Sequence, residues 1–129
     1  MKNLSVKHEV IMQRAEKVNP SDLEQYKLVI FGSPTWESNG KDAVPHEFMM
    51  DLLRRVAAER IIPKQYTVFG CGNRSFTNFC GAVDYIDAAL RSLGSKKIFP
   101  TLKLDGYYLD LSLNQKLVDG WTAKLLTEI

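Results

Sequence analysis

The 129-residue sequence lacks several features that would assign it to a specialised class of protein. No apolar run approaches the roughly 20 residues that a membrane-spanning helix needs, and residues 1–7 lack the apolar stretch of a signal peptide. With 17 Lys and Arg against 15 Asp and Glu, the chain also lacks the charge excess that favours nucleic acid or an anionic membrane as a partner. We therefore expect a soluble, cytoplasmic protein with no nucleic-acid or membrane partner.

Cysteine and histidine are also scarce. Cys71 and Cys80 are nine positions apart, which fits neither the ligand spacing of a zinc site nor a dithiol redox pair. We expect free thiols because a reducing cytoplasm disfavours disulfides, although a disulfide between these two residues is geometrically conceivable. His8 and His46 have no companions at ligand spacing, so no metal site is predicted.

Short apolar runs alternate with longer helical patterns, and this alternation predicts a parallel sheet with crossover helices. Residues 27–33 (KLVIFGS) and 66–72 (YTVFGCG) are nearly continuous apolar runs, typical of central strands that are covered on both faces. Residues 97–104 (KIFPTLKL) indicate a strand interrupted at Pro100, which suits an edge strand or a bulge. The length and the 45% hydrophobic content predict a single α/β domain over residues 1–129.

Helical periodicity appears in three segments. The first, residues 44–60, has Pro45 near its first turn, where proline is tolerated, and the second ends at Gly94, where a cap with positive φ is common. The apolar faces expected to pack on the sheet are Phe48, Leu52, Leu53 and Val56 in the first helix, Phe79, Val83, Ile86, Leu90 and Leu93 in the second, and Leu113, Leu117, Trp121 and Leu125 in the third.

The N-terminal part predicts a strand over residues 8–15 (HEVIMQRA), followed by a turn at residues 19–22 with Ser21 as a helix N-cap. The coarse order is therefore strand, short helix, strand, helix, strand, helix, strand, helix. An α/β domain of this kind normally opens with one more strand and helix, so the pattern lacks its first unit.

Two segments that follow the buried strands carry the functional signal: residues 32–40 (GSPTWESNG) and 70–84 (GCGNRSFTNFCGAVD). They closely resemble the loops that enclose the flavin in flavodoxins, especially the short-chain bacterial kind, where they follow the third and fourth strands. The matching region covers residues 26–121, and its most specific part is FCGAVD at residues 79–84. The resemblance implies a flavodoxin-like three-layer sandwich with a mostly parallel sheet.

The resemblance also implies a site for the isoalloxazine ring of FMN, which needs aromatic faces and nearby backbone donors and acceptors. Trp36 would cover the inner face of the ring and Phe76, at a position that is usually tyrosine, the outer face. The alternative is that each aromatic side chain folds back onto the core. Cys80 is also a candidate for contact with the ring, but the interpretation that it fills space as a small apolar side chain is at least as strong. The remaining cofactor-binding candidates are Pro34, Thr35, Glu37, Cys71, Gly72, Asn73 and Phe79.

Two positions depart from the family pattern. Glu37 stands where flavodoxins commonly have a glycine whose peptide turns over when the flavin is reduced, and a side chain there resists the positive φ that glycine accepts. We therefore expect weaker stabilisation of the one-electron-reduced flavin. Asn73, followed by Arg74, replaces a usual aspartate, and the loss of negative charge near the ring predicts a less negative second potential. The alternative for Arg74 is a solvated loop cation.

Flavodoxins begin with a strand, a turn of the type Thr-x-Thr-Gly-x-Thr and a helix whose N-terminus receives the phosphate, and this sequence contains no such turn. The first βα unit is therefore expected to be missing and the affinity for FMN to be low. In the strand order 2-1-3-4-5 the absent strand is central, which leaves two strand edges to be paired. Residues 8–15, a second chain in a homodimer, or a segment upstream of Met1 could pair them. We favour a rearranged sheet, formed either within one chain or in a dimer.

The sequence thus predicts a low-potential, FMN-binding electron-transfer protein that serves redox partner proteins and has no catalytic residues, with FMN bound weakly or not at all. An alternative from another class is a flavin-free flavodoxin-like scaffold or protein-binding module that uses its aromatic loops to meet a partner. A third, weaker alternative is a small flavin reductase or quinone reductase.

Overall fold

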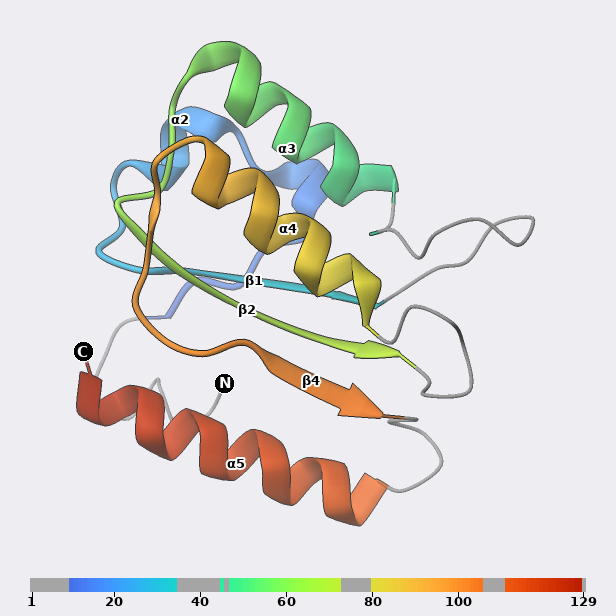
Figure 1. Cartoon of the computed structure of the whole chain (residues 1–129). Helices are drawn as coiled ribbons and strands as arrows, with labels where there is room; N and C mark the ends of the chain where they lie inside the picture. Colours follow the sequence, from blue (N-terminus) through green and yellow to red (C-terminus); the bar gives the residue numbers. More distant parts are fainter. Residues whose placement is uncertain (1–9, 35–44, 46, 73–79, 106–110, 129) are drawn as a thin grey trace.

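A computed structural model describes residues 10–34, 45, 47–72, 80–105 and 111–128 of the chain. It is a three-layer α/β arrangement in which α3 and α4 cover one face of a parallel sheet and α5 covers the other (Figure 1). The elements are η1 (Ala15–Lys17), α2 (Pro20–Leu23), β1 (Val29–Pro34), α3 (Glu47–Glu59), β2 (Gln65–Gly72), α4 (Gly81–Ser92), β3 (Lys96–Lys97), β4 (Leu102–Asp105) and α5 (Leu111–Glu128).

The sheet is built around β2, which pairs in parallel with β1 on one side and with both β3 and β4 on the other. β3 and β4 are the two halves of the strand predicted over residues 97–104. The predicted interruption at Pro100 is confirmed, because β3 pairs with the start of β2 and β4 with its end. The Thr67 hydroxyl donates a 2.9 Å hydrogen bond to the carbonyl of Phe99 between the two halves and helps to hold the interrupted segment against β2.

Both predicted strands are confirmed, although in the described part of the chain β1 pairs only with β2 and is therefore an edge strand. Their side chains divide between two cores. On the α3 and α4 side, Phe31, Tyr66 and Val68 belong to the larger hydrophobic cluster. On the α5 side, Ile30 and Phe69 pack against Trp121 and Leu125. Alternate residues of a strand point to opposite faces, so a near-continuous apolar run is what a sheet covered on both sides requires.

Helix α4 matches its prediction closely. Val83, Ile86 and Leu90 are fully buried, and each such side chain contributes roughly 1.5–3 kcal/mol to the stability of the fold. The helix ends as expected at Gly94, whose φ of +90° lies in the left-handed region that glycine adopts at low cost. The N–H group of Ser95 then donates a 3.1 Å hydrogen bond back to the carbonyl of Leu90.

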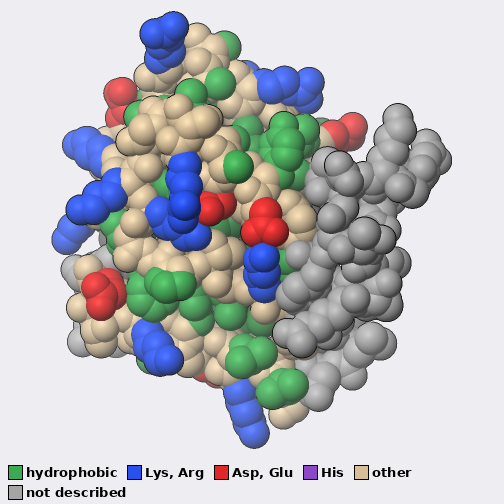
Figure 2. All heavy atoms as spheres, viewed as in Figure 1, with side chains coloured by type: hydrophobic (Ala, Val, Ile, Leu, Met, Phe, Trp, Pro, Cys, Tyr) green, Lys and Arg blue, Asp and Glu red, His purple; other side chains and the backbone are tan. Residues whose placement is uncertain are grey.

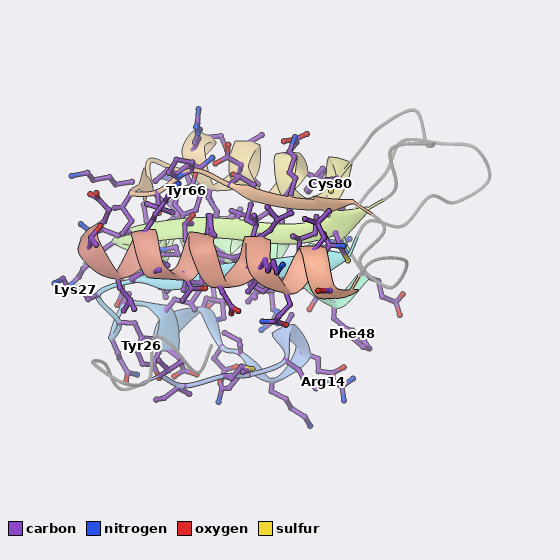
Figure 3. The ribbon with its side chains drawn as sticks, turned by 90° about the horizontal axis from the view of Figure 1, so that it is seen from below. Arg14, Tyr26, Lys27, Phe48, Tyr66 and Cys80 are labelled. Atoms are coloured by element: carbon purple, nitrogen blue, oxygen red, sulfur yellow. The ribbon has the colours of Figure 1, made fainter. Side chains whose placement is uncertain are left out.

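Helix α3 begins later than predicted, at Glu47, and Pro45 lies near its first turn as expected, two residues before the helix. Leu52, Leu53 and Val56 are buried as predicted. The expectation that Phe48 packs on the sheet was wrong, because Phe48 is 40% exposed and lies on the outside of the molecule (Figure 3), while its neighbour Met49 is buried. The buried face of a helix is about 100° wide, which is also the angle between adjacent residues. Either Phe48 or Met49 could therefore lie at the edge of that face.

Helix α5 is present as predicted, but its apolar repeat faces the core only in its C-terminal half. Trp121 and Leu125 are buried against the sheet, whereas Leu113 and Leu117 are 53% and 44% exposed. The prediction was therefore wrong for these two leucines. Within the part of the chain that the structure describes, no helix is both long enough and apolar enough to cross a bilayer.

The N-terminal prediction was wrong in two respects. Residues 10–14 form neither helix nor strand, and Ala15 begins the short helix η1, so the strand predicted over residues 8–15 is not formed in its described part. The residue that precedes α2 is Asn19, not Ser21, and its side chain makes no capping hydrogen bond. The idea that residues 8–15 pair with β1 to rearrange the sheet is likewise wrong over residues 10–15.

Candidate functional site

The carboxyl ends of β1, β2 and β4 lie together at one edge of the sheet (Figure 1). The pairing aligns Pro34 of β1 with Cys71 of β2, and Gly72 of β2 with Asp105 of β4. Adjacent strands are about 4.8 Å apart, so these three strand ends lie within a span of about 10 Å. Open α/β sheets bind their ligands at this edge, and we call it the carboxyl edge.

The end of β2 is packed tightly against its neighbours by two glycines. A Cβ atom at Gly70 would lie 2.3 Å from the carbonyl oxygen of Ser33, and one at Gly72 would lie 2.8 Å from the backbone nitrogen of Cys80. Both distances are shorter than real Cβ contacts, so any other residue would push β2 away from β1 or from α4. The glycines therefore fix the spacing between the strand ends and the start of α4.

Cys80 joins β2 to α4 at the carboxyl edge and has a left-handed backbone, with φ 52° and ψ 35°. Its side chain is fully buried in the larger core cluster, and its Sγ lies 3.6 Å from the carbonyl oxygen of Leu104, to which the thiol donates. This environment favours the interpretation of Cys80 as a small apolar filler that ties α4 to β4. Figure 3 shows Cys80 at the end of the ribbon where β2 stops.

Both cysteines are free thiols. Burial raises the pKa of Cys80 to about 11, with a further increase from the neighbouring Cys71, and burial also raises the pKa of Cys71. At neutral pH both groups are therefore protonated, and the thiolate that nucleophilic catalysis requires is scarce. The arrangement gives no support to thiol chemistry at this edge.

A single ion pair joins α4 and β4 near the carboxyl edge in the described part of the chain. The Nζ atom of Lys103 lies 2.9 Å from Oδ1 of Asp84 and donates a 3.0 Å hydrogen bond to its Oδ2. The pair is largely exposed, so its contribution to stability is small. Its effect on the edge is to cancel one positive charge with one negative charge.

The structure places four of the predicted site residues, and it pairs Pro34 with Cys71 and packs Gly72 against Cys80. Sequence reasoning missed that β4 also ends at the carboxyl edge, because the strand was predicted to stop at Leu104 and Asp105 was not considered. The remaining candidates lie outside the described residues and stay predictions: Thr35, Trp36, Glu37, Asn73, Phe76 and Phe79.

The described part of the chain offers no metal site. Among the described residues, no group of three or more His, Cys, Asp or Glu side chains is arranged to hold a metal ion. The carboxyl edge therefore remains the candidate site on the grounds of topology, tight packing and half-buried backbone at the strand ends.

Comparison with known proteins identifies the family to which the chain belongs. The family model described as Flavodoxin matches residues 2–112. The chain belongs to the flavodoxin family. It is 32% identical over 124 residues to a flavodoxin of Nitratidesulfovibrio vulgaris, spanning 95% of this chain and 80% of the relative. It is 33% identical over 100 residues to a flavodoxin of Maridesulfovibrio salexigens, spanning 76% of this chain and 66% of the relative.

Solved flavodoxins have the same fold. The crystal structure of a Fusobacterium nucleatum flavodoxin bound to flavin mononucleotide superposes with a TM-score of 0.75 at 17% identity, covering 99% of this chain and 86% of that one. The likeness confirms the predicted flavodoxin-like α/β fold.

The described part of the carboxyl edge fits the polar side of a flavin in its chemistry. Cys71 and Gly72 end β2 half-buried, and α4 begins beside them after an N-cap residue whose side chain makes no capping hydrogen bond. Backbone N–H and C=O groups at such a position are the donors and acceptors that a pyrimidine edge requires. The predicted stacking surfaces for the ring, Trp36 and Phe76, lie outside the described residues.

Proposed function

We propose that this chain is an FMN-binding electron-transfer protein of the flavodoxin type. The observation that carries the proposal is the shared carboxyl edge of β1, β2 and β4 in a member of the flavodoxin family. FMN supplies the electron-accepting and electron-donating chemistry when it is bound, and the chain binds the ring, orients it and limits its contact with water. The FMN bound to the Fusobacterium nucleatum flavodoxin supports this choice of cofactor.

The proposed ring site combines two aromatic side chains with backbone groups at the strand ends. Trp36 stacks on the inner face of the isoalloxazine ring and Phe76 on the outer face, since flat apolar rings stack favourably on aromatic side chains. The backbone around Cys71 and Gly72 meets the pyrimidine edge. The remaining proposed contacts come from Pro34, Thr35, Glu37, Asn73 and Phe79, and from the backbone of Cys80, whose side chain is buried in the core.

We further propose a carrier rather than an enzyme. Flavodoxins pass electrons between partner proteins, and the thiols of Cys71 and Cys80 have pKa values raised by burial, which disfavours covalent catalysis by them. The partners are accordingly redox proteins, and the proposed location is the cytoplasm. A small flavin or quinone reductase remains the competing activity, and oxidation of a nicotinamide donor without any partner protein would favour it.

Homodimerisation is a separate part of the proposal. β1 pairs with β2 along one edge, and a strand from a second copy at its other edge would complete a sheet that both helical layers already cover. Analytical ultracentrifugation over a hundredfold range of concentration checks this. A constant monomer mass contradicts the dimer and leaves the flavin proposal intact.

The test of the function is a titration of the purified 129-residue chain with FMN and with riboflavin, followed by visible absorption and flavin fluorescence. We expect both ligands to bind with altered spectra and with affinities within about tenfold of each other, because the sequence holds no phosphate-binding turn of the family type. FMN binding more than a hundredfold tighter than riboflavin would show that another segment holds the phosphate.

Matched variants locate the ring. Trp36→Leu and Phe76→Leu should each weaken flavin binding at least tenfold, a loss of about 1.4 kcal/mol. Tyr85→Leu removes an exposed aromatic side chain from α4 and should leave the affinity unchanged. Equal affinities for all three variants, or no spectral change on adding flavin to the wild-type chain, would exclude the proposed site.

A further inference from the structure

A groove lies beside α5, on the side of the sheet that is formed by β3 and β4 and is farthest from β1. One wall comes from the segment between β3 and β4, and the other from α5. Its volume is about 340 Å³, which accommodates one or two large side chains. The lining residues are Phe99, Pro100, Lys116, Leu117, Gly120, Trp121 and Lys124.

The floor of the groove is aromatic and held in place from several sides. Nε1 of Trp121 donates a 2.8 Å hydrogen bond to the carbonyl oxygen of Pro100. The Trp121 ring contacts Phe99 edge-on, at 5.7 Å between ring centroids, and tilts against Phe69 at 6.2 Å. A fixed aromatic surface loses little conformational entropy when an apolar side chain packs on it, which is a property of binding hot spots.

Gly120 is unusual because it lies in the interior of α5, where glycine costs about 1 kcal/mol relative to alanine. A Cβ atom at this position would meet no atom within 4 Å, so neither core packing nor a close approach of backbone requires the glycine. Because glycine has no side chain, the groove stays open beside Trp121. Leu117, one turn earlier, leaves 44% of its surface in solvent at the same groove.

The charge of the groove identifies what can cover this apolar floor. Lys116 and Lys124 flank Gly120 one turn away on either side, and no acidic residue joins them among the described residues that line the groove. Neither lysine side chain forms an ion pair within the part of the chain that the structure describes. Figure 2 shows hydrophobic side chains next to basic side chains along the lower part of the molecule, over α5, whose basic residues are lysines.

We infer that this groove is a docking site for an acidic segment of a partner protein that inserts one large apolar side chain beside Trp121 and Gly120 and places carboxylates next to Lys116 and Lys124. A second copy of the chain fits poorly, because symmetric pairing of the groove would bring four lysines together. The inference goes beyond the proposed function, since it needs no flavin and concerns a surface separate from the carboxyl edge.

The experiment uses the flavin-free chain and three ten-residue peptides. The first carries a central leucine flanked by Asp and Glu, the second replaces that leucine with serine, and the third replaces the acids with lysine. Two-dimensional 15N–1H NMR titration should show saturable binding of the first peptide alone. The shifted signals should include the Gly120 amide and the Trp121 indole N–H.

Matched variants separate the groove from charge alone. Gly120→Leu fills the groove and should weaken the first peptide at least tenfold, while Ala123→Leu adds the same side chain to the exposed part of α5 outside the groove and should not. Lys116→Glu combined with Lys124→Glu should abolish binding. The control is a second double variant, Lys64→Glu with Lys96→Glu. It changes the net charge by the same amount at a separate hollow that these two lysines line, so the affinity for the first peptide should stay within about twofold of the wild-type value.

Four outcomes would overturn the inference: no saturable binding of the acidic leucine peptide, equal binding of the serine peptide, insensitivity to Gly120→Leu, or shifts that map to the hollow near Lys64 and Lys96. Self-association through α5, seen as a mass that doubles with concentration and is lost in Gly120→Leu, would replace the partner with a second copy. Far-UV circular dichroism of each variant confirms that it is folded.

Discussion

The hydroxyl of Tyr66, near the start of strand β2, donates a 2.6 Å hydrogen bond to Oδ1 of Asp87 on α4. Oδ2 of the same carboxylate lies 3.3 Å from Nε of Arg91 and 3.3 Å from Nζ of Lys97 on β3. One carboxylate thus joins the central strand, the covering helix and the edge strand. Tyr66 and Cys80 lie towards opposite ends of the ribbon (Figure 3), so this network can be altered without touching the carboxyl edge.

Removal of the Tyr66 hydroxyl should destabilise the fold. Tyr66 is fully buried, and Tyr66→Phe leaves a part-buried carboxylate without its shortest hydrogen bond, at a cost of about 1–2 kcal/mol in the free energy of unfolding. Urea denaturation measures this loss. The control is Tyr85→Phe on α4, the helix that carries Asp87, where the tyrosine side chain is 42% exposed and the change should stay within about 0.5 kcal/mol. Equal effects of the two variants would contradict the assigned role.

The carboxylate of Asp87 should make the stability depend on pH. Burial acts to raise the pKa of Asp87, but the hydrogen bond from Tyr66 and the charges of Lys97 and Arg91 outweigh it and hold the pKa below its ordinary value. Because the folded pKa lies below the unfolded pKa of about 3.9, the stabilisation is present above pH 4 and is lost as the pH falls through the folded value.

Asp87→Asn isolates this contribution. The variant keeps an acceptor for the Tyr66 hydroxyl but loses the charge that pairs with Lys97 and Arg91, so it should be less stable than the wild type at pH 7. The difference should shrink steadily below pH 4, as measured by urea denaturation at a series of pH values. A difference that stays constant from pH 7 to pH 2 would show that the charge of Asp87 contributes nothing.

The two thiols should react at different rates. Cys80 is fully buried with a pKa raised to about 11, so its reaction with a disulfide reagent at pH 8 should proceed only as fast as the protein opens. Cys71 is half-buried and should react first, although more slowly than a free thiol because burial raises its pKa as well. Cys71→Ala and Cys80→Ala assign the two phases. Two equally fast thiols in the native protein would contradict the packing of Cys80 beneath Gly72.

The parts of the fold that the sequence predicted are those set by local pattern. Continuous apolar runs identified β1 and β2, and spacings of three and four residues identified α4 together with its cap at Gly94. The repeat in α5 was misleading because it recurs every four residues. Each such step rotates a residue by about 40° around the helix, so Leu113 lies about 120° away from Leu125 and cannot share its face.

The failure of residues 10–14 to form a strand could not be predicted from their composition, because a strand needs a neighbour, and Val10, Ile11 and Met12 remain exposed in the structure. At the candidate site, the sequence identified the strand ends, since glycine and proline punctuate them. It could not reveal that Gly72 is required by the backbone of Cys80, or that β4 ends at the same edge, because both depend on register between distant segments.

The last prediction concerns Glu37. If the peptide after Trp36 must adopt a positive φ when flavin is reduced, the Cβ atom of Glu37 opposes that change by about 1 kcal/mol or more, and glycine relieves it. Glu37→Gly should therefore increase the maximal fraction of one-electron-reduced flavin in a spectroscopic redox titration of the chain saturated with flavin. Glu37→Gln removes the charge but keeps the Cβ atom, so it should resemble the wild type. If Gln raises that fraction as much as Gly does, charge rather than backbone conformation governs the reduced state, and a wild-type chain that already holds a large, stable one-electron-reduced population would refute the backbone argument outright.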